Sequence, residues 1–155
     1  MLGVVDDLGF RELARARCLE LLATVPVGRV GLSVGALPVV LPVNFVLAGD
    51  RLVFRTVPGT KLDAAAVRAV VAFEADAYDA GGAWGWSVMV QGQSAEITAP
   101  EELAEMRKLR LDAWAQPQRA TRFVAVRITF VSGRCFGELP AMLAAAAAAP
   151  QANRR

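Results

Sequence analysis

The segment 51–63, read RLVFRTVPGTKLD, brings together residues that could hold an anion. Its first six residues alternate as in a half-buried strand, and Pro58-Gly59 then predicts a turn. Thr60 and Lys61 follow at the predicted start of a helix. The unpaired amides and the positive dipole end of a helix start attract anions. A hydroxyl and an ammonium beside them would complete a phosphate site.

Lysine is rare in this chain, which makes a lysine at this turn notable. Lys61 and Lys108 are the two lysines, against 15 arginines. The alternative interpretation is an ordinary strand–turn–helix junction with a solvated lysine. Because G-T-K lacks the full glycine spacing of a P-loop, the turn alone leaves both interpretations open.

The composition predicts one globular domain. The chain has 155 residues and a mass of 16.5 kDa, with 55% hydrophobic and 21% charged residues, which is enough to bury a core. A net charge of +2 with mixed signs favours neither a nucleic acid nor a membrane surface as partner. The acidic start does not resemble a secretory signal, and no apolar run is long enough to span a bilayer. We therefore expect a cytoplasmic protein.

The residue types that are absent exclude much chemistry. No histidine occurs, so neither a Ser-His-Asp catalytic set nor a histidine metal site can form. Cys18 and Cys135 are far apart in sequence and too few for zinc or an iron–sulfur cluster, and they predict no disulfide framework. We predict no metal site. Any catalysis should come from carboxylates, arginines, hydroxyls or a bound organic cofactor.

Hydrophobic periodicity predicts three helices and six strands. The helices cover residues 10–23, residues 62–67 and a stretch from a capping box at 98–101 to about Trp114. The strands cover residues 28–34, 39–47, 51–56, 69–76, 84–98 and 122–131.

These elements predict a mainly β fold, a six-stranded antiparallel barrel with flanking helices. Short connectors favour an antiparallel meander, and closure removes exposed strand edges. Pro42 cannot donate to a ladder, and Asn44 adds a polar group to an apolar run. Both fit an edge or a split in the barrel, and both also fit a strand that serves a ligand. We expect a single domain over residues 1–140 and an Ala-rich tail over 141–155, either helical or frayed.

Four stretches of sequence carry a family resemblance. They read PVGRVGL, PVVLPVNFVLAGDRLVFRTVPGTKLDA, VAFEAD and GWSVMVQGQSAEIT. In this order they resemble the pyridoxamine 5'-phosphate oxidase-like family of FMN-binding split barrels, over residues 18–136. The likeness is greatest to its small actinobacterial and nitroimidazole-reductase-like branches. Its most specific parts are the T-x-x-G-T-K turn and the W-S-V-x-V-x-G strand.

The resemblance implies a flavin site at the interface of a two-fold homodimer. The FMN phosphate would lie at the turn after the third strand, and the isoalloxazine ring along the second strand. The fifth strand would contribute from the other side. The implied cofactor-binding residues are Pro42, Val43, Asn44, Arg55, Thr56, Thr60, Lys61, Trp86 and Ser87. Taken without the resemblance, Trp86 is a core or dimer contact and Ser87 a weak signal.

The resemblance further implies an FMN-dependent oxidoreductase that transfers hydride through flavin N5. Its partner would be a nicotinamide or another small-molecule redox substrate. Nitroimidazole reductases use a histidine near the flavin, which this chain lacks. True pyridoxamine phosphate oxidases bind substrate phosphate with a C-terminal tryptophan and arginine, which SGRCFGELP does not clearly supply. Neither specific activity is expected, and no catalytic residue is predicted.

A plain interaction domain with an empty groove stays open at the level of sequence, and so do two ligand-binding alternatives to this function. One is a deazaflavin-dependent reductase of the same fold, whose more anionic cofactor would need more basic groups than Arg55 and Arg29. The other is a non-catalytic protein that binds a flavin or haem. The absence of histidine weakens the haem alternative, because the axial ligand would have to come from another residue type.

Overall fold

A computed structural model describes residues 9–66, 68–109, 111 and 118–144. The chain divides into two compact units. We call Pro26–Glu74 and Val90–Phe130 the barrel unit, and Met1–Val25, Ala75–Met89 and Val131–Arg155 the terminal unit.

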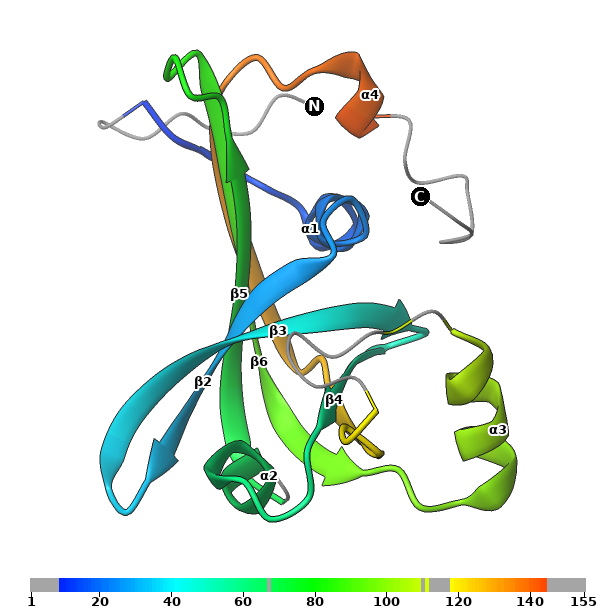
Figure 1. The fold of residues 1–155 in the computed structure, drawn as a ribbon. Helices are drawn as coiled ribbons and strands as arrows, with labels where there is room; N and C mark the ends of the chain where they lie inside the picture. The colour runs from blue at the N-terminus through cyan, green and yellow to red at the C-terminus, as the bar shows by residue number, and fades with distance from the viewer. Residues whose placement is uncertain (1–8, 67, 110, 112–117, 145–155) are drawn as a thin grey trace. The chain divides into compact units, whose positions relative to one another are not determined.

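Strands dominate the described part of the chain, with short helices between them (Figure 1). The strands are β1 (Arg11–Glu12), β2 (Val27–Val34), β3 (Leu37–Ala48), β4 (Arg51–Thr56), β5 (Val70–Tyr78), β6 (Trp84–Glu96), β7 (Arg122–Arg127) and β8 (Phe130–Gly137). The helices are α1 (Arg15–Leu22), α2 (Lys61–Ala66), α3 (Pro100–Lys108) and α4 (Ala141–Ala144).

Six strands close into a ring. The order β6–β5–β2–β3–β4–β7 is completed by a second pairing of β6 with β7. The registers of β2 with β3 and β5, of β4 with β3 and β7, and of β6 with β7 are all antiparallel. In Figure 1, β2 and β3 form a long twisted hairpin. The predicted mainly β, six-stranded antiparallel split barrel with flanking helices is confirmed.

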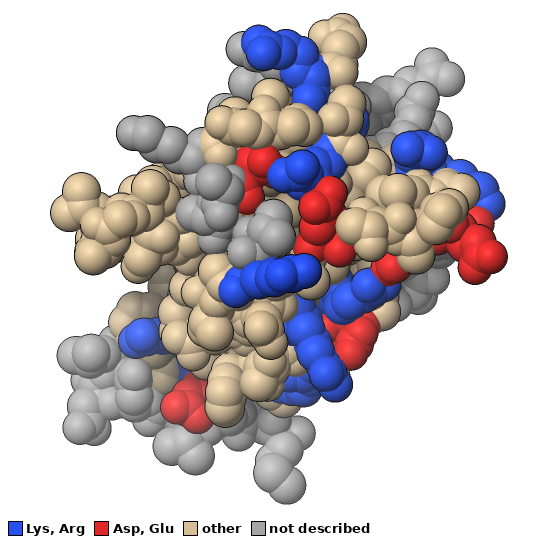
Figure 2. Space-filling model, turned by 90° about the horizontal axis from the view of Figure 1, so that it is seen from below, with Lys and Arg blue, Asp and Glu red and all other residues tan. Residues whose placement is uncertain are grey.

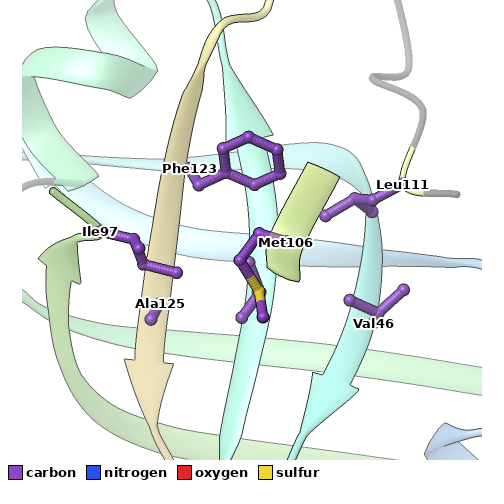
Figure 3. Packing of buried hydrophobic residues seen from close by; sticks show 7 residues of the cluster. Val46, Ile97, Met106, Leu111, Phe123 and Ala125 are labelled. Atoms are coloured by element: carbon purple, nitrogen blue, oxygen red, sulfur yellow. The ribbon is translucent and has the colours of Figure 1, made fainter. Parts of the chain in front are cut away.

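Strand β4 is buried on both of its faces. Leu52 and Phe54 are fully buried on one face, where Val126 and Val124 stand opposite them on β7. Val53, on the other face, belongs to a hydrophobic cluster that packs α3 against the outer side of the strands (Figure 3). This α3 cluster comprises Val46, Val53, Ile97, Met106, Leu111, Phe123 and Ala125. A strand with apolar residues on both faces reads as a continuous apolar run, which explains the sequence LVF.

The N-terminal helix is shorter than the predicted 10–23. Arg11 and Glu12 form β1, which pairs with β8 opposite Cys135 and Arg134. The helix begins only at Arg15 and ends at Leu22. The helical spacing of apolar residues alone predicts a helix from residue 10. The later start depends on a contact remote in sequence, in which Leu13 donates its backbone amide to the carbonyl of Gly133.

Two further predictions of element ends are wrong. The last strand, predicted over 122–131, is two strands: β7 ends at Arg127, and the amides of Ile128 and Thr129 turn to the carbonyls of Asp50 and Gln91. The predicted capping box does not form, because α3 is capped at Ala99 with Pro100 in its first turn and no side-chain cap. The predicted helix end near Trp114 lies outside the described residues.

The middle of the chain follows the sequence-based expectation closely. Strand β4 has the predicted bounds, and β2, β3, β5, β6 and α2 differ from them by one or two residues at either end. Of the expected tail, the structure describes α4, and the residues after 144 lie outside it.

Two glycines on β2 differ in the room around them, which gives a matched test of barrel packing. A Cβ at Gly28 would overlap the ring of Phe73 and lie 2.7 Å from the carbonyl oxygen of Glu74. A Cβ at Gly31 would meet Ala72 only at 3.7 Å. We expect Gly28→Ala to lower the free energy of unfolding by about 1–3 kcal/mol, because Phe73 is fully buried and its neighbours must shift.

The control variant, Gly31→Ala, should change the free energy of unfolding by less than about 1 kcal/mol. Both are measured by urea denaturation followed by tryptophan fluorescence. Equal stabilities of the two variants would contradict the packing described here.

Candidate functional site

Strand β3 presents two different faces at the residues expected to lie along a flavin ring. Its register places Pro42 opposite Arg29 and Val43 opposite Gly28 of β2. Pro42 is exposed and Asn44 half-buried, on the outward face, whereas Val43 is buried on the inward face. The side-chain amide of Asn44 donates through Nδ2 to the backbone carbonyl of Pro26 at 3.4 Å. Pro42 and Asn44 can therefore offer side chains to a ligand outside the barrel, and Val43 only its backbone.

The turn before α2 is ordered by its own hydrogen bonds. The Thr60 hydroxyl donates to the carbonyl of Val57 (2.8 Å) and accepts the amide of Asp63 (3.2 Å). The amide of Gly59, a residue in the left-handed region at φ +80°, donates to Oδ2 of Asp63 at 2.9 Å. The backbone amide of Thr60 donates to the carbonyl of Val57. The amides of Gly59, Thr60 and Asp63, which a helix start could offer to an anion, thus already have acceptors. Anion binding here would depend on side chains.

Asp63 is the buried charge around which this turn is built. Asp63 is only 4% exposed. Its carboxylate accepts hydrogen bonds from the Thr56 hydroxyl at 2.9 Å and from Nη1 of Arg122 at 2.6 Å. Burial alone would raise the pKa of Asp63. The hydrogen bonds from Gly59, Thr56 and Arg122, with the positive charge of Arg122, outweigh burial and lower that pKa. Arg122 also contacts Glu96 at 3.0 Å.

Three of the four residues expected at the phosphate are at or beside this turn. Thr56 is buried, and its hydroxyl is directed to Asp63, so it supports the turn from beneath. Thr60 is exposed on the turn. Lys61 begins α2, and its side chain lies outside the described part of the structure.

Arg55, the fourth, lies on the other face of β4. Successive residues of a strand alternate in direction, so Arg55 and Thr56 point to opposite sides. Arg55 stands opposite Phe123 in the ladder with β7, and its guanidinium lies 5.4 Å from the centre of that ring. Its Nη1 donates to the carbonyl of Leu111 at 3.1 Å. The structure thus brings Arg55 into a pocket beside α3.

Trp86 and Ser87 belong to the terminal unit. Because they are successive residues of β6, their side chains point to opposite faces of the strand. Trp86 is 3% exposed, and among the described residues its indole N–H meets no acceptor. Ser87 is half-buried. A buried donor without an acceptor is costly, so Trp86 is notable even without a ligand in view.

Sequence reasoning missed Asp63 and Arg122. A signal for Asp63 was present, because Thr60 and Asp63 have the spacing of a helix cap with an acidic residue three positions on. For Arg122 there was none, since it comes from a strand 59 positions away.

Three further findings concern the surface charges, metal binding and the length of the helices. Figure 2 shows basic and acidic side chains interspersed on one face of the molecule. Within the described ranges, no group of three or more His, Cys, Asp or Glu could hold a metal ion. None of the helices found in those ranges has the length and apolar character needed to cross a membrane.

Comparison with known proteins covers the whole barrel. A family model described as pyridoxamine 5'-phosphate oxidase matches residues 14–135. An uncharacterized protein of Mycobacterium tuberculosis is 38% identical over 128 residues, which is 79% of this chain and 82% of that protein. The solved FAD binding protein of Mycobacterium smegmatis is 35% identical with a TM-score of 0.70, over 81% of this chain and 97% of that one. A Corynebacterium diphtheriae protein of unknown function is 30% identical with a TM-score of 0.69, over 83% and 98%.

The Asp63 contacts lead to a prediction for stability and its pH dependence. Asp63→Asn should lower the free energy of unfolding at pH 7 by about 2–3 kcal/mol, because an amide cannot accept from all three donors and leaves an NH2 group facing one of them. Since the folded pKa lies below the unfolded value, the stabilisation is fully present above about pH 4. It is lost as the pH falls through the folded value.

The difference between wild type and Asp63→Asn should therefore shrink below about pH 4, as measured by urea denaturation at several pH values. Glu96→Gln, which leaves the Asp63–Arg122 pair intact, should cost less than about 1 kcal/mol. A difference that stays constant down to pH 2 would contradict the assignment.

Proposed function

This chain belongs to the pyridoxamine 5'-phosphate oxidase family, and on that premise we propose that it is a flavin-dependent oxidoreductase. The observation that carries the proposal is the likeness of the whole barrel to a protein named for binding FAD, at 35% identity. FMN and FAD share the riboflavin 5'-phosphate part. The proposed site binds that shared part, and FMN is the expected cofactor.

The residues of the barrel unit fit such a group in part. The outward face of β3 offers an exposed proline without an amide and the side chain of Asn44, so an aromatic ring could lie along it and take a hydrogen bond. Lys61 supplies a cation for the phosphate, and the hydroxyl of the exposed Thr60, which donates to the carbonyl of Val57, would have to rotate to donate to the phosphate.

In this proposal the chain's own residues hold and orient, and the cofactor carries the reaction. A bound flavin supplies hydride transfer at N5. Thr60 and Lys61 bind the phosphate, and Thr56 and Asp63 are positioning residues that keep the turn in shape. Pro42 and Asn44 orient the ring. The electron donor would be a nicotinamide or another small-molecule redox substrate.

The basic groups near the site favour a common flavin over a deazaflavin. The outward face of β3 and β2 carries Arg29, which already pairs with Glu74 at 3.5 Å. Arg55 lies on the α3 side of β4. Neither arginine places a further positive charge at the Thr60–Lys61 turn, where the longer anionic tail of a deazaflavin cofactor would need one.

A homodimer is the proposed assembly, as the family likeness implies. Val40 of β3 and Val70 of β5 are 68% and 80% exposed. The register places Val40, Gly31 and Ala72 side by side, so Val70 faces the same way as Val40. The two valines lie on the strands that flank β2, on a face that also carries the Arg29–Glu74 pair. Large apolar side chains exposed on one shared face favour an interface. It is also the face along which the flavin ring is proposed to lie.

The cofactor proposal is tested by the spectrum of the purified protein, by mass identification of what is released on denaturation, and by titration with FMN, FAD and a deazaflavin. We expect a bound or readily accepted flavin. Lys61→Ala should weaken binding of FMN by about tenfold or more, because it removes the cation at the phosphate. Protein that takes up none of the three cofactors would end the proposal.

The control for Lys61→Ala is Lys108→Ala. Lys108 is exposed at the end of α3 and pairs with Glu105, so its loss should leave flavin affinity unchanged. Equal affinity of Lys61→Ala and wild type, in a protein that still binds FMN, would remove the turn from the site.

The dimer is tested by light scattering of the full chain. We expect Val40→Glu to shift the mass from dimer toward monomer, because a charge on this face must be desolvated on association. Tyr78→Glu, at an exposed position of the terminal unit, should leave the mass unchanged. A monomeric wild-type protein at micromolar concentration would refute the assembly.

A further inference from the structure

A pocket of about 310 Å³ lies at the C-terminal end of α3. It is lined by Arg55, Arg107, Leu109, Leu111, Thr121 and Phe123, all residues of the barrel unit. The size is at the lower end of the range for small-molecule sites, so it fits a small ligand or one end of a larger one. Its wall combines cationic, hydroxyl and apolar groups.

One of the two cations is held in place by the barrel. The guanidinium of Arg55 lies 5.4 Å from the centre of the Phe123 ring and donates to the carbonyl of Leu111 at 3.1 Å. Arg55 is half-buried, and Phe123 belongs to the α3 cluster. A guanidinium fixed in orientation before a ligand arrives loses little conformational entropy on binding.

The second cation comes from the last turn of α3. Arg107 is exposed there and lines the same pocket, together with the hydroxyl-bearing Thr121. Its neighbour Lys108 pairs with Glu105 and is not part of the lining. Two arginines that line one small pocket are suited to a carboxylate or phosphate group, to which guanidiniums donate charge-assisted hydrogen bonds.

We propose that this pocket binds a small organic anion. The oxyanion pairs with Arg55 and Arg107 and takes a hydrogen bond from Thr121. The apolar body of the ligand packs against Phe123, Leu109 and Leu111. A purely inorganic anion would leave this apolar wall in water, so we expect an organic anion to bind more tightly.

The pocket is separate from the turn proposed for the flavin phosphate. In the ladder of β4 with β7, Arg55 stands opposite Phe123 and Thr56 opposite Arg122. Paired residues share a face and successive residues alternate. Thr56 and Arg122 meet at Asp63, below the α2 turn, and Arg55 and Phe123 meet at the pocket on the other face. The proposal therefore goes beyond the flavin function and does not depend on it.

The test is calorimetric titration of the full chain with phenyl phosphate and with benzoate, in the absence of FMN and with FMN at saturation. Inorganic phosphate measures the contribution of the oxyanion alone, and benzyl alcohol measures the contribution of the apolar body alone. We expect saturable binding of at least one aromatic anion, weaker binding of both partial probes, and no competition with FMN. The two anions distinguish a phosphate ligand from a carboxylate ligand.

The variants are Arg107→Gln, Arg107→Lys and Lys108→Gln, all at exposed positions where folding should be unaffected. Arg107→Gln should weaken binding of the anion by about tenfold, and Arg107→Lys by less, because it keeps the charge. Lys108→Gln should bind as the wild type does. Far-ultraviolet circular dichroism confirms that each variant is folded.

Three results would overturn the proposal: no saturable binding of either anion, equal affinity of Arg107→Gln and wild type, or displacement of the anion by FMN. A protein that binds phenyl phosphate but takes up no flavin would refute the flavin function and leave the pocket standing. A protein that binds FMN but neither anion would refute the anion pocket and leave the flavin function standing.

Discussion

The carboxylate of Asp63 joins the end of β4 and the turn before α2 to a strand that is remote in the sequence. It accepts hydrogen bonds from Thr56 at the end of β4, from Gly59 in the turn before α2 and from Arg122 at the start of β7. A buried carboxylate is tolerated only while such donors surround it. The turn that carries Thr60 and Lys61 is therefore fixed to the barrel wall by one side chain, and the position of any group bound there depends on that contact.

This contact also separates the two faces of the β4–β7 ladder by their chemistry. One face ends at Arg122, whose guanidinium is shared by the carboxylates of Asp63 and Glu96. The opposite face ends in Arg55 against Phe123, close to the basic last turn of α3. A strand pair buried on both sides can carry two independent sites, because adjacent residues point in opposite directions while the backbone holds both in register.

Strand β3 shows how the barrel could serve a cofactor without giving up its core. Its inward residues Val43 and Phe45 are buried, whereas Pro42 and Val40 are exposed on the outward side. The closed ring supplies rigidity, and the outward face is left for recognition. In the proposed function the chemistry comes from the flavin, which agrees with a chain that contains no histidine and in which no catalytic residue could be predicted.

The sequence by itself determined the strand pattern of the middle of the chain, the barrel fold and the family, because alternation, turn residues and local motifs are short-range signals. It also placed the Thr60–Lys61 turn at the start of a helix. Only the tertiary structure decided what each polar group faces. Arg55 and Thr56 are neighbours in sequence but point to different faces, and Asp63 finds Arg122 across 59 positions. The start of α1 and the break between β7 and β8 depend on hydrogen bonds to remote carbonyls, which periodicity does not encode.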